Sequence, residues 1–179
     1  MTDYFSKWIE AESFVQVKEK EVISFIKRNI LTRFGIPAEI ICDNGSQFIS
    51  LRTRNFCTSW GIKLITSTPV HPQANGQAES SNKIIINNLK KRLSEKRGRW
   101  AEELPLVLWA DRTTAQTSTG KTPYSLVFGT EAVIPPEVMI PTTRTRLRNS
   151  EENNEILSQD LDTVDELRDL AKIRMGAYQ

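Results

Sequence analysis

Two acidic residues, Asp43 and Glu79, stand where a carboxylate can take part in chemistry. Asp43 follows a short apolar run and opens a Gly-containing turn, and Glu79 follows a stretch rich in Pro, Gly and Asn. Carboxylates at the ends of neighbouring elements can converge, and two of them can hold the cations of two-metal phosphoryl transfer. Each also has a purely structural interpretation, because Asp commonly forms turns and Glu commonly stabilises the first turn of a helix.

The elements that position these acids follow from the spacing of the apolar residues. A helical pattern that leads into a short apolar strand is typical of an α/β protein. The sequence predicts, in order, a bent strand over residues 1–15, a helix over 18–34, a strand over 39–42, a helix over 50–60, a strand over 62–65, a loop over 66–76, and helices over 77–93, 100–114 and 151–178.

The charge is unevenly distributed along the 179 residues. Residues 1–149 hold 21 Lys and Arg against 14 Asp and Glu, whereas residues 150–179 hold 3 against 8, so +7 and −5 give the net charge of +2. A basic body favours a polyanionic partner, although a solvated surface gives a similar count.

The composition excludes several classes of protein. Hydrophobic residues make up 39% and charged residues 26% of the chain, as in ordinary globular proteins. No apolar run has the length of a membrane span, and no signal peptide is recognisable, so we expect an intracellular protein with no membrane partner. One histidine and two cysteines exclude a Cys/His zinc module, and we expect Cys42 and Cys57 to be buried thiols.

Two segments around the acids resemble the catalytic core of retroviral-type integrases. They are CDNGSQF at 42–48 and HPQANGQAESSNK at 71–83, with 35 residues between Asp43 and Glu79. The later segments WAEEL at 100–104, LWADRT at 108–113 and TGKTPY at 119–124 are similar to gypsy-type long-terminal-repeat retrotransposon polyproteins, particularly those of plants. The resemblance covers nearly the whole chain.

This resemblance implies a fold, an activity and a set of ligands. The implied fold is a ribonuclease-H-like mixed sheet flanked by helices. The implied activity joins element DNA ends to target DNA with two Mg²⁺ or Mn²⁺ ions, which three acids bind. Asp43 and Glu79 match the second and third of these acids, and both are therefore expected catalytic residues and metal ligands. The resemblance also implies a polyprotein origin, a nuclear location and a possible homo-oligomer.

The first acid of the family is not obvious in this sequence. Asp3 precedes Asp43 by 39 residues, but the segment DYFSKWIEA at 3–11 resembles the family's second strand and the start of its third. We therefore expect the first strand and its Asp to lie before Met1. The alternative, that Asp3 takes the role, stays open, and so does the question of whether this chain is an active enzyme.

Several residues near Glu79 are candidates for DNA contacts. Residues 83–99 hold seven Lys and Arg, and such groups give salt-dependent affinity for phosphates. Lys83 lies four residues after Glu79, on the same helical face. The predicted nucleic-acid-binding residues are Asn75, Gln77, Asn82, Lys83, Lys90 and Lys91.

The sequence leaves three interpretations of function. The leading one is an integrase core fragment, with a core over 1–114, an extended linker over 115–149 and an acidic helix over 150–179 that leads to an absent C-terminal domain. The second is a catalytically inactive nucleic-acid-binding or assembly remnant, which the lack of a first Asp favours. A glycosidase with two carboxylates is disfavoured, because no aromatic-lined sugar cleft is recognisable.

Overall fold

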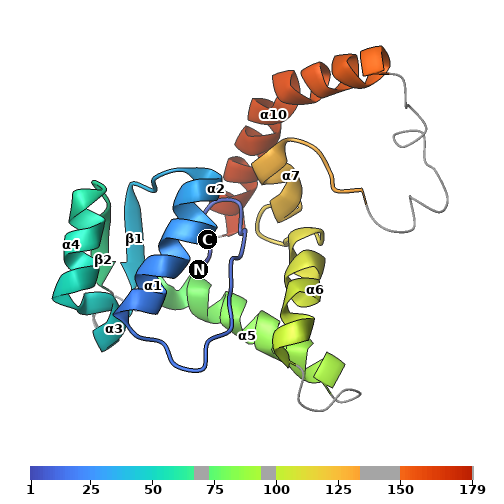
Figure 1. The fold of residues 1–179 in the computed structure, drawn as a ribbon. Helices are drawn as coiled ribbons and strands as arrows, with labels where there is room; N and C mark the ends of the chain where they lie inside the picture. Colours follow the sequence, from blue (N-terminus) through green and yellow to red (C-terminus); the bar gives the residue numbers. More distant parts are fainter. Residues whose placement is uncertain (67–72, 94–99, 134–149, 179) are drawn as a thin grey trace. The chain divides into compact units, whose positions relative to one another are not determined.

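A computed structural model of the chain describes residues 1–66, 73–93, 100–133 and 150–178 (Figure 1). These residues form two compact units. The first unit consists of Met1 and Glu10–Leu104, and the second consists of Thr2–Ile9 and Pro105–Gln179. The functional division proposed from the sequence, with bounds at residues 114 and 149, stays a prediction.

The first unit begins with one continuous helical segment. It comprises α1 (Glu19–Phe25), the π-helix η1 (Ile26–Leu31) and α2 (Thr32–Phe34). The backbone N–H of Lys18 donates to the carboxylate of Glu21 (3.1 Å) at the start, and Gly35 ends the segment with φ of +87°. The predicted helix over 18–34 is confirmed, but its middle third is wound more widely than an α-helix.

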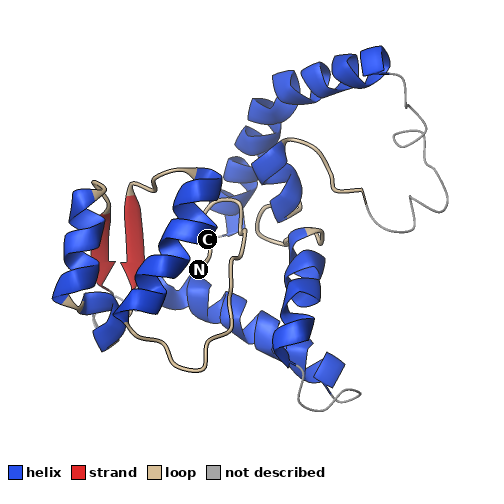
Figure 2. Ribbon diagram, viewed as in Figure 1, coloured by secondary structure: helices blue, strands red, loops and turns tan. Residues whose placement is uncertain are grey.

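Two parallel strands form the sheet of this unit (Figure 2). They are β1 (Glu39–Cys42) and β2 (Lys63–Thr66), in register from Glu39 opposite Lys63 to Cys42 opposite Thr66. The connection between them contains α3 (Ser46–Ile49) and α4 (Leu51–Ser59), and the side chain of Ser50 caps α4 by accepting from the N–H of Thr53. The core consists of Val22, Ile26, Ile40, Cys57 and Ile62. The predictions for β1, α4 and β2 are confirmed, and α3 was not anticipated.

Side chains of η1 and α2 hold residues 10–12 in the first unit. The Arg28 guanidinium and the Asn29 amide donate to the carboxylate of Glu12, at 2.9 and 3.2 Å. The guanidinium of Arg33 donates to Glu10 at 2.6 Å, and the side chain of Glu10 is only 6% exposed. The backbone of residues 10–12 is therefore held by three side chains from one helical segment.

Helix α5 (Gln73–Leu93) follows β2 and contacts β1. The sequence predicted a loop over 66–76 and a helix only from residue 77. The loop prediction is wrong for 73–76, where the backbone is already helical, while residues 67–72 lie outside the described residues. Ile85 and Leu89, one turn apart, are the buried residues of this helix among those described.

The predicted strand at the start of the chain is wrong. Thr2 and Ile9 form only an isolated antiparallel bridge. Between them the carboxylate of Asp3 accepts hydrogen bonds from the N–H and the hydroxyl of Ser6, at 2.7 and 2.6 Å. Lys7 adopts a left-handed backbone conformation with φ of +63°. This tight turn replaces a continuous strand, because Asp and Ser side chains stabilise turns by bonding to nearby backbone.

Three helices make up most of the second unit. They are α6 (Trp100–Arg112), whose residues from Pro105 onward belong to this unit, α7 (Pro123–Phe128) and α10 (Ser150–Tyr178). The side chain of Thr122 caps α7 by accepting from the N–H of Ser125, and Gly129 ends α7 with φ of +82°. Within the predicted linker over 115–149, the short apolar stretch at 123–128 is thus helical, and residues 134–149 lie outside the described residues. The helix predicted over 151–178 is confirmed.

The C-terminal helix α10 packs on α7. The guanidinium of Arg168 donates to the backbone carbonyls of Leu126 and Val127, at 3.2 and 3.4 Å, in the last turn of α7. A Cβ atom added at Gly129 would lie 3.1 Å from a methyl of Val164. Glycine therefore suits position 129 for two reasons. It adopts the positive φ without strain, and it has no Cβ atom that would crowd Val164.

An aromatic cluster joins the start of the chain to α7 within the second unit. Trp8 packs edge-on against Phe128, with ring centroids 5.6 Å apart, and Tyr124 lies 4.7 Å from Phe128. The guanidinium carbon of Arg112 lies 4.4 Å from the centroid of the Trp8 ring. The same guanidinium donates to the backbone carbonyl of Ile9 at 2.7 Å. Trp8 is consequently buried, at 6% exposure.

Candidate metal and nucleic-acid site

Asp43 directly follows the carboxyl end of β1 and opens the turn before α3. Its Oδ1 accepts a 2.9 Å hydrogen bond from the backbone N–H of Gly45. The turn-forming interpretation of Asp43 is therefore correct. It does not exclude a ligand role, because a carboxylate has a second oxygen and further lone pairs.

Gly45 leaves little room for any other residue. A Cβ atom at this position would lie 2.9 Å from Oδ1 of Asp43 and 2.6 Å from Nε2 of Gln47. Its φ of −57° is ordinary, so the requirement for glycine comes from this close approach and not from backbone strain. The sequence analysis missed Gly45 as a positioning residue, although the Asp-Asn-Gly order was a signal for a tight turn.

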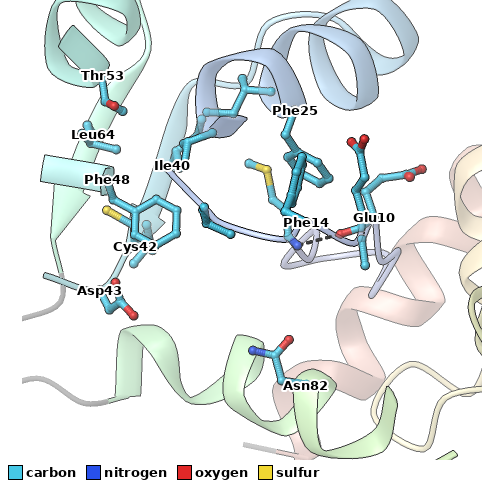
Figure 3. Close-up of a pocket in the computed structure, with 17 residues that line it drawn as sticks. Glu10, Phe14, Phe25, Ile40, Cys42, Asp43, Phe48, Thr53, Leu64 and Asn82 are labelled. Atoms are coloured by element: carbon cyan, nitrogen blue, oxygen red, sulfur yellow. Dashed lines mark hydrogen bonds between the residues drawn. The ribbon is translucent and has the colours of Figure 1, made fainter. Parts of the chain in front are cut away.

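Asp43 lies at one end of a cavity of about 380 Å³ (Figure 3). Phe48, Phe25 and Phe14 contribute to its apolar walls. Asn82 of α5 also lines the cavity, and Figure 3 shows its amide directed toward the space that Asp43 borders. The structure thus brings together Asp43 and one of the predicted DNA-contact residues.

Helical geometry indicates which of the other predicted residues on α5 share a face with Glu79. Residues three, four, seven and eleven positions apart lie close to one face of a helix. Glu79 is part of α5, so Asn82, Lys83, Ile86 and Lys90 follow it along that face. Lys83 and Lys90 are exposed, as is Lys91 farther round the helix. The prediction that Lys83 shares a face with Glu79 is confirmed for the backbone, whereas a separation of Asp43 and Glu79 short enough to share a cation stays a prediction.

Asn75 and Gln77 have a different setting from the one expected. They were predicted in a loop or at its end, and both lie in the first turns of α5. Their proposed contacts with DNA stay predictions, as do those of Asn82, Lys83, Lys90 and Lys91.

The donor set around the cavity suits a hard divalent cation. A carboxylate and an amide oxygen are ligands of the kind that Mg²⁺ accepts, and Mg²⁺ commonly keeps several waters beside one or two carboxylates. No group of three or more His, Cys, Asp or Glu side chains that could hold a metal ion occurs in the described part of the chain. Asp43 and Asn82 line the same cavity, and a metal site formed by Asp43 with Glu79 stays a prediction.

Asp3 has a structural role of its own. Its carboxylate holds the turn at Ser6, and its backbone carbonyl accepts from the N–H of Lys7 at 3.1 Å. Asp3 belongs to the second unit and Asp43 to the first. Whether Asp3 replaces the first catalytic acid therefore stays a question for experiment.

Both cysteines are buried free thiols, as predicted. Burial raises the pKa of Cys57 and of Cys42, and the carboxylate of Asp43 raises the pKa of Cys42 further. Ionisation of the Cys42 thiol is therefore disfavoured directly beside the carboxylate of Asp43.

The structure assigns roles to two residues of α6 that the sequence analysis only quoted within a motif. Asp111 is 7% exposed, and its Oδ2 has no hydrogen-bond partner among the described residues. Burial raises the pKa of Asp111, against the lowering effects of Gln116 and Arg112. Arg112 anchors Ile9 and Trp8, as described above. No signal in a single sequence distinguishes these buried roles from surface charges.

Comparison with solved structures defines the class of protein. The fold is similar to that of integrase catalytic cores, which is ribonuclease-H-like. A simian T-cell lymphotropic virus intasome in complex with the PP2A regulatory subunit B56 gamma matches with a TM-score of 0.64 and 26% identity, over 75% of this chain and 48% of that one. The HTLV-2 integrase catalytic core domain in complex with magnesium, in a trimeric form, matches with a TM-score of 0.59 and 27% identity, over 70% and 80% of the two chains. The expected fold class is confirmed.

The sequence comparisons agree with this class. Residues 1–72 match the model of the integrase core domain. The Gag-Pol polyprotein of gibbon ape leukemia virus is 35% identical over 128 residues, or 71% of this chain and 8% of that protein. That of avian reticuloendotheliosis virus is 29% identical over 138 residues, or 77% and 12%. The chain thus spans only about a tenth of the polyproteins it matches. Among the described helices, none is long and apolar enough to cross a membrane.

Proposed function

We propose that this chain is the catalytic-core segment of an integrase from a gypsy-type retrotransposon polyprotein. It binds DNA, and in the complete protein it serves the joining of element ends to target DNA in the nucleus. One observation carries the proposal. In a fold similar to integrase cores, Asp43 directly follows β1 and borders a cavity that Asn82 of α5 also lines.

The chain's own residues have distinct tasks in this function. The N–H of Gly45 fixes one oxygen of Asp43, which limits the rotation of the carboxylate. Asp43 and Glu79 would hold Mg²⁺ or Mn²⁺, and the bound ion would supply charge stabilisation at a reacting phosphate. Asn82 offers an amide to the DNA backbone at the same cavity. The exposed Lys83, Lys90 and Lys91 bind phosphates farther along α5, and Asn75 and Gln77 contact DNA from its first turns.

Titration calorimetry of the 179-residue chain with Mn²⁺ tests the metal site directly. We expect saturable binding that Asp43→Asn and Glu79→Gln each weaken by at least about tenfold, because each removes an ionised oxygen ligand. Asp165→Asn is the matched control, since the Asp165 side chain is 89% exposed on α10. Binding that survives both substitutions would refute the assignment of the two acids.

A second measurement separates DNA binding from metal binding. Fluorescence anisotropy with a labelled duplex should show that Asp43→Asn leaves affinity unchanged without metal. Replacing Lys83 by Ala should weaken binding with or without metal. A chain that binds Mn²⁺ but no DNA would contradict the integrase-core proposal.

A further inference from the structure

Helix α10 has one packing face, which α7 covers in its later part. The members of this face are Leu157, Leu161, Val164 and Arg168. They are three or four positions apart, so they lie in line along the helix. Val164 closely approaches Gly129, and the guanidinium of Arg168 donates to backbone carbonyls in the last turn of α7. The later half of the face is therefore a contact with α7.

The earlier half of the same face is exposed. Figure 1 shows α7 beside the later part of α10, while the earlier part extends beyond it. Leu157 is 43% exposed and Leu161 is 62% exposed. Helices in water owe most of their stability to the packing of an apolar face, and isolated helices are marginal. Two exposed leucines in line with the contacts to α7 therefore indicate the place of a partner.

The charge around these leucines is negative. Residues 150–167 hold seven Asp and Glu and no Lys or Arg. Asp160 and Asp165 lie roughly 70° to either side of the mean direction of the face, at 100° per residue. The Asp165 side chain is 89% exposed, although its carboxylate lies 3.8 Å from Arg168. Such a surface repels nucleic acid, so the partner that fits it carries positive charge.

The spacing of the leucines favours a helix as the partner. Leu157 and Leu161 are ~6 Å apart along the axis, which is one helical turn. A second amphipathic helix laid alongside meets such a row with its own apolar residues at i, i+3, i+4 and i+7. Lysine or arginine beside that apolar row would reach Asp160 and Asp165, because their long stems pack on apolar surface while the charge stays in water.

We propose that Leu157 and Leu161 of α10, flanked by Asp160 and Asp165, form a docking surface for a basic amphipathic helix of another protein. The apolar face of that helix covers the two leucines, and its cations pair with the flanking carboxylates. The inference goes beyond the function proposed above, since it concerns a protein partner of α10 and neither metal nor DNA.

A designed peptide tests the surface on the full 179-residue chain. The probe is a labelled helix of about 18 residues, with leucine along one face and lysine and alanine elsewhere. The matched peptide has the same composition, with its leucines distributed around the helix. Fluorescence anisotropy should show the first peptide binding with a Kd on the order of 10 μM, as for a small interface, and the second at least about tenfold more weakly.

Two leucines of α10 provide matched variants of the chain. Leu161→Ser should weaken binding of the first peptide by about tenfold or more, because it removes an apolar anchor. Leu170→Ser should leave the affinity unchanged. Leu170 is 61% exposed, like Leu161, but nine positions later on the helix it lies about 180° away. Since both side chains are exposed, circular dichroism should show the same helix content for both variants.

The flanking acids provide a test of the charge. Asp160→Asn combined with Asp165→Asn should weaken binding of the first peptide by about threefold and reduce its dependence on salt, because exposed ion pairs are weak and screened. An affinity that the two substitutions leave unchanged would contradict the pairing of cations with these carboxylates.

Three results would overturn the proposal. The first is equal affinity of the two peptides, and the second is equal affinity of the Leu161→Ser and Leu170→Ser variants for the first peptide. The third is a dimer of the unmodified chain, detected by sedimentation velocity, that Leu161→Ser dissociates. A second copy of the chain would then occupy the surface in place of another protein.

Discussion

The backbone N–H of Gly45 and the carboxylate of Asp43 form a hydrogen bond of 2.9 Å across the turn that ends β1. This bond sets the orientation of the acidic side chain that lines the cavity directly after β1. The turn after β1 therefore also fixes the orientation of the candidate metal ligand Asp43.

Gly45→Ala should lower Mn²⁺ affinity by about tenfold while changing Tm little. A Cβ at this position would lie 2.9 Å from Oδ1 of Asp43, so the carboxylate must move away. Titration calorimetry measures the affinity. Gly76→Ala in α5 is the control, because an added Cβ there meets nothing within 4 Å. It should stabilise the helix by about 0.5–1 kcal/mol and leave Mn²⁺ binding unchanged.

Lys90 and Lys91 should contribute to the salt dependence of DNA binding. If three or four cations contact phosphates, the slope of log K against log salt is near −3, and replacing both lysines by Ala should flatten it by about 2. Anisotropy titrations between about 50 and 200 mM salt measure the slope. Lys18→Ala with Lys20→Ala removes the same charge away from α5. An affinity of the unmodified chain that ignores salt would refute phosphate binding.

Asp111→Asn should stabilise the protein at neutral pH. Burial raises the pKa of the folded carboxyl above its unfolded value of about 3.9, so ionisation opposes folding once the pH exceeds the unfolded value. The Tm difference between the variant and the unmodified chain should widen as the pH rises from about 4 and become constant above the raised pKa. Thermal melts across this range measure it. Asp165→Asn, at an exposed site, should show no such trend.

Arg33→Ala should destabilise the protein by about 1–3 kcal/mol, because it removes a cation from the buried carboxylate of Glu10. Urea unfolding measures the change. Arg28→Ala is the matched control, since its pair with Glu12 is largely exposed and should be worth less than about 1 kcal/mol. Equal losses in the two variants would show that burial of Glu10 adds nothing.

Asp3→Asn should leave Mn²⁺ affinity unchanged and lower Tm slightly. The carboxylate of Asp3 already accepts two hydrogen bonds from Ser6, and an amide oxygen replaces the charged acceptor only in part. A loss of Mn²⁺ binding as large as that of Asp43→Asn would make Asp3 the first catalytic acid after all.

Regular periodicity made several elements predictable. The apolar spacing of 18–34 and 151–178 and the apolar run of 39–42 each determined an element that the structure contains. The strand expected over 1–15 failed because a strand needs a paired neighbour, and the Asp3 side chain offered the backbone a turn instead. Helix α5 began earlier than expected because Gly76, although a poor helix former, is tolerated at an exposed position.

The candidate site was predictable in its residue types but not in its distances. The positions of Asp43 and Asn82 came from a motif, and their shared cavity came only from the structure. The role of Gly45 depends on a contact of 2.9 Å to one side-chain oxygen, which no sequence pattern encodes. Asp111 looked like any charged helix residue, because burial depends on what packs over it.

The π-helix η1 has a consequence for how this segment tolerates insertion and deletion. A π-turn is in effect one extra residue within an α-helix, so loss of one codon between residues 26 and 31 would leave an uninterrupted α-helix. Because the π-turn absorbs the extra residue, Val22 before it and Arg33 after it would keep their faces of the helix. Arg33 would then still face Glu10. A single-codon gap in an alignment of relatives at this point would therefore be compatible with the same ion pair.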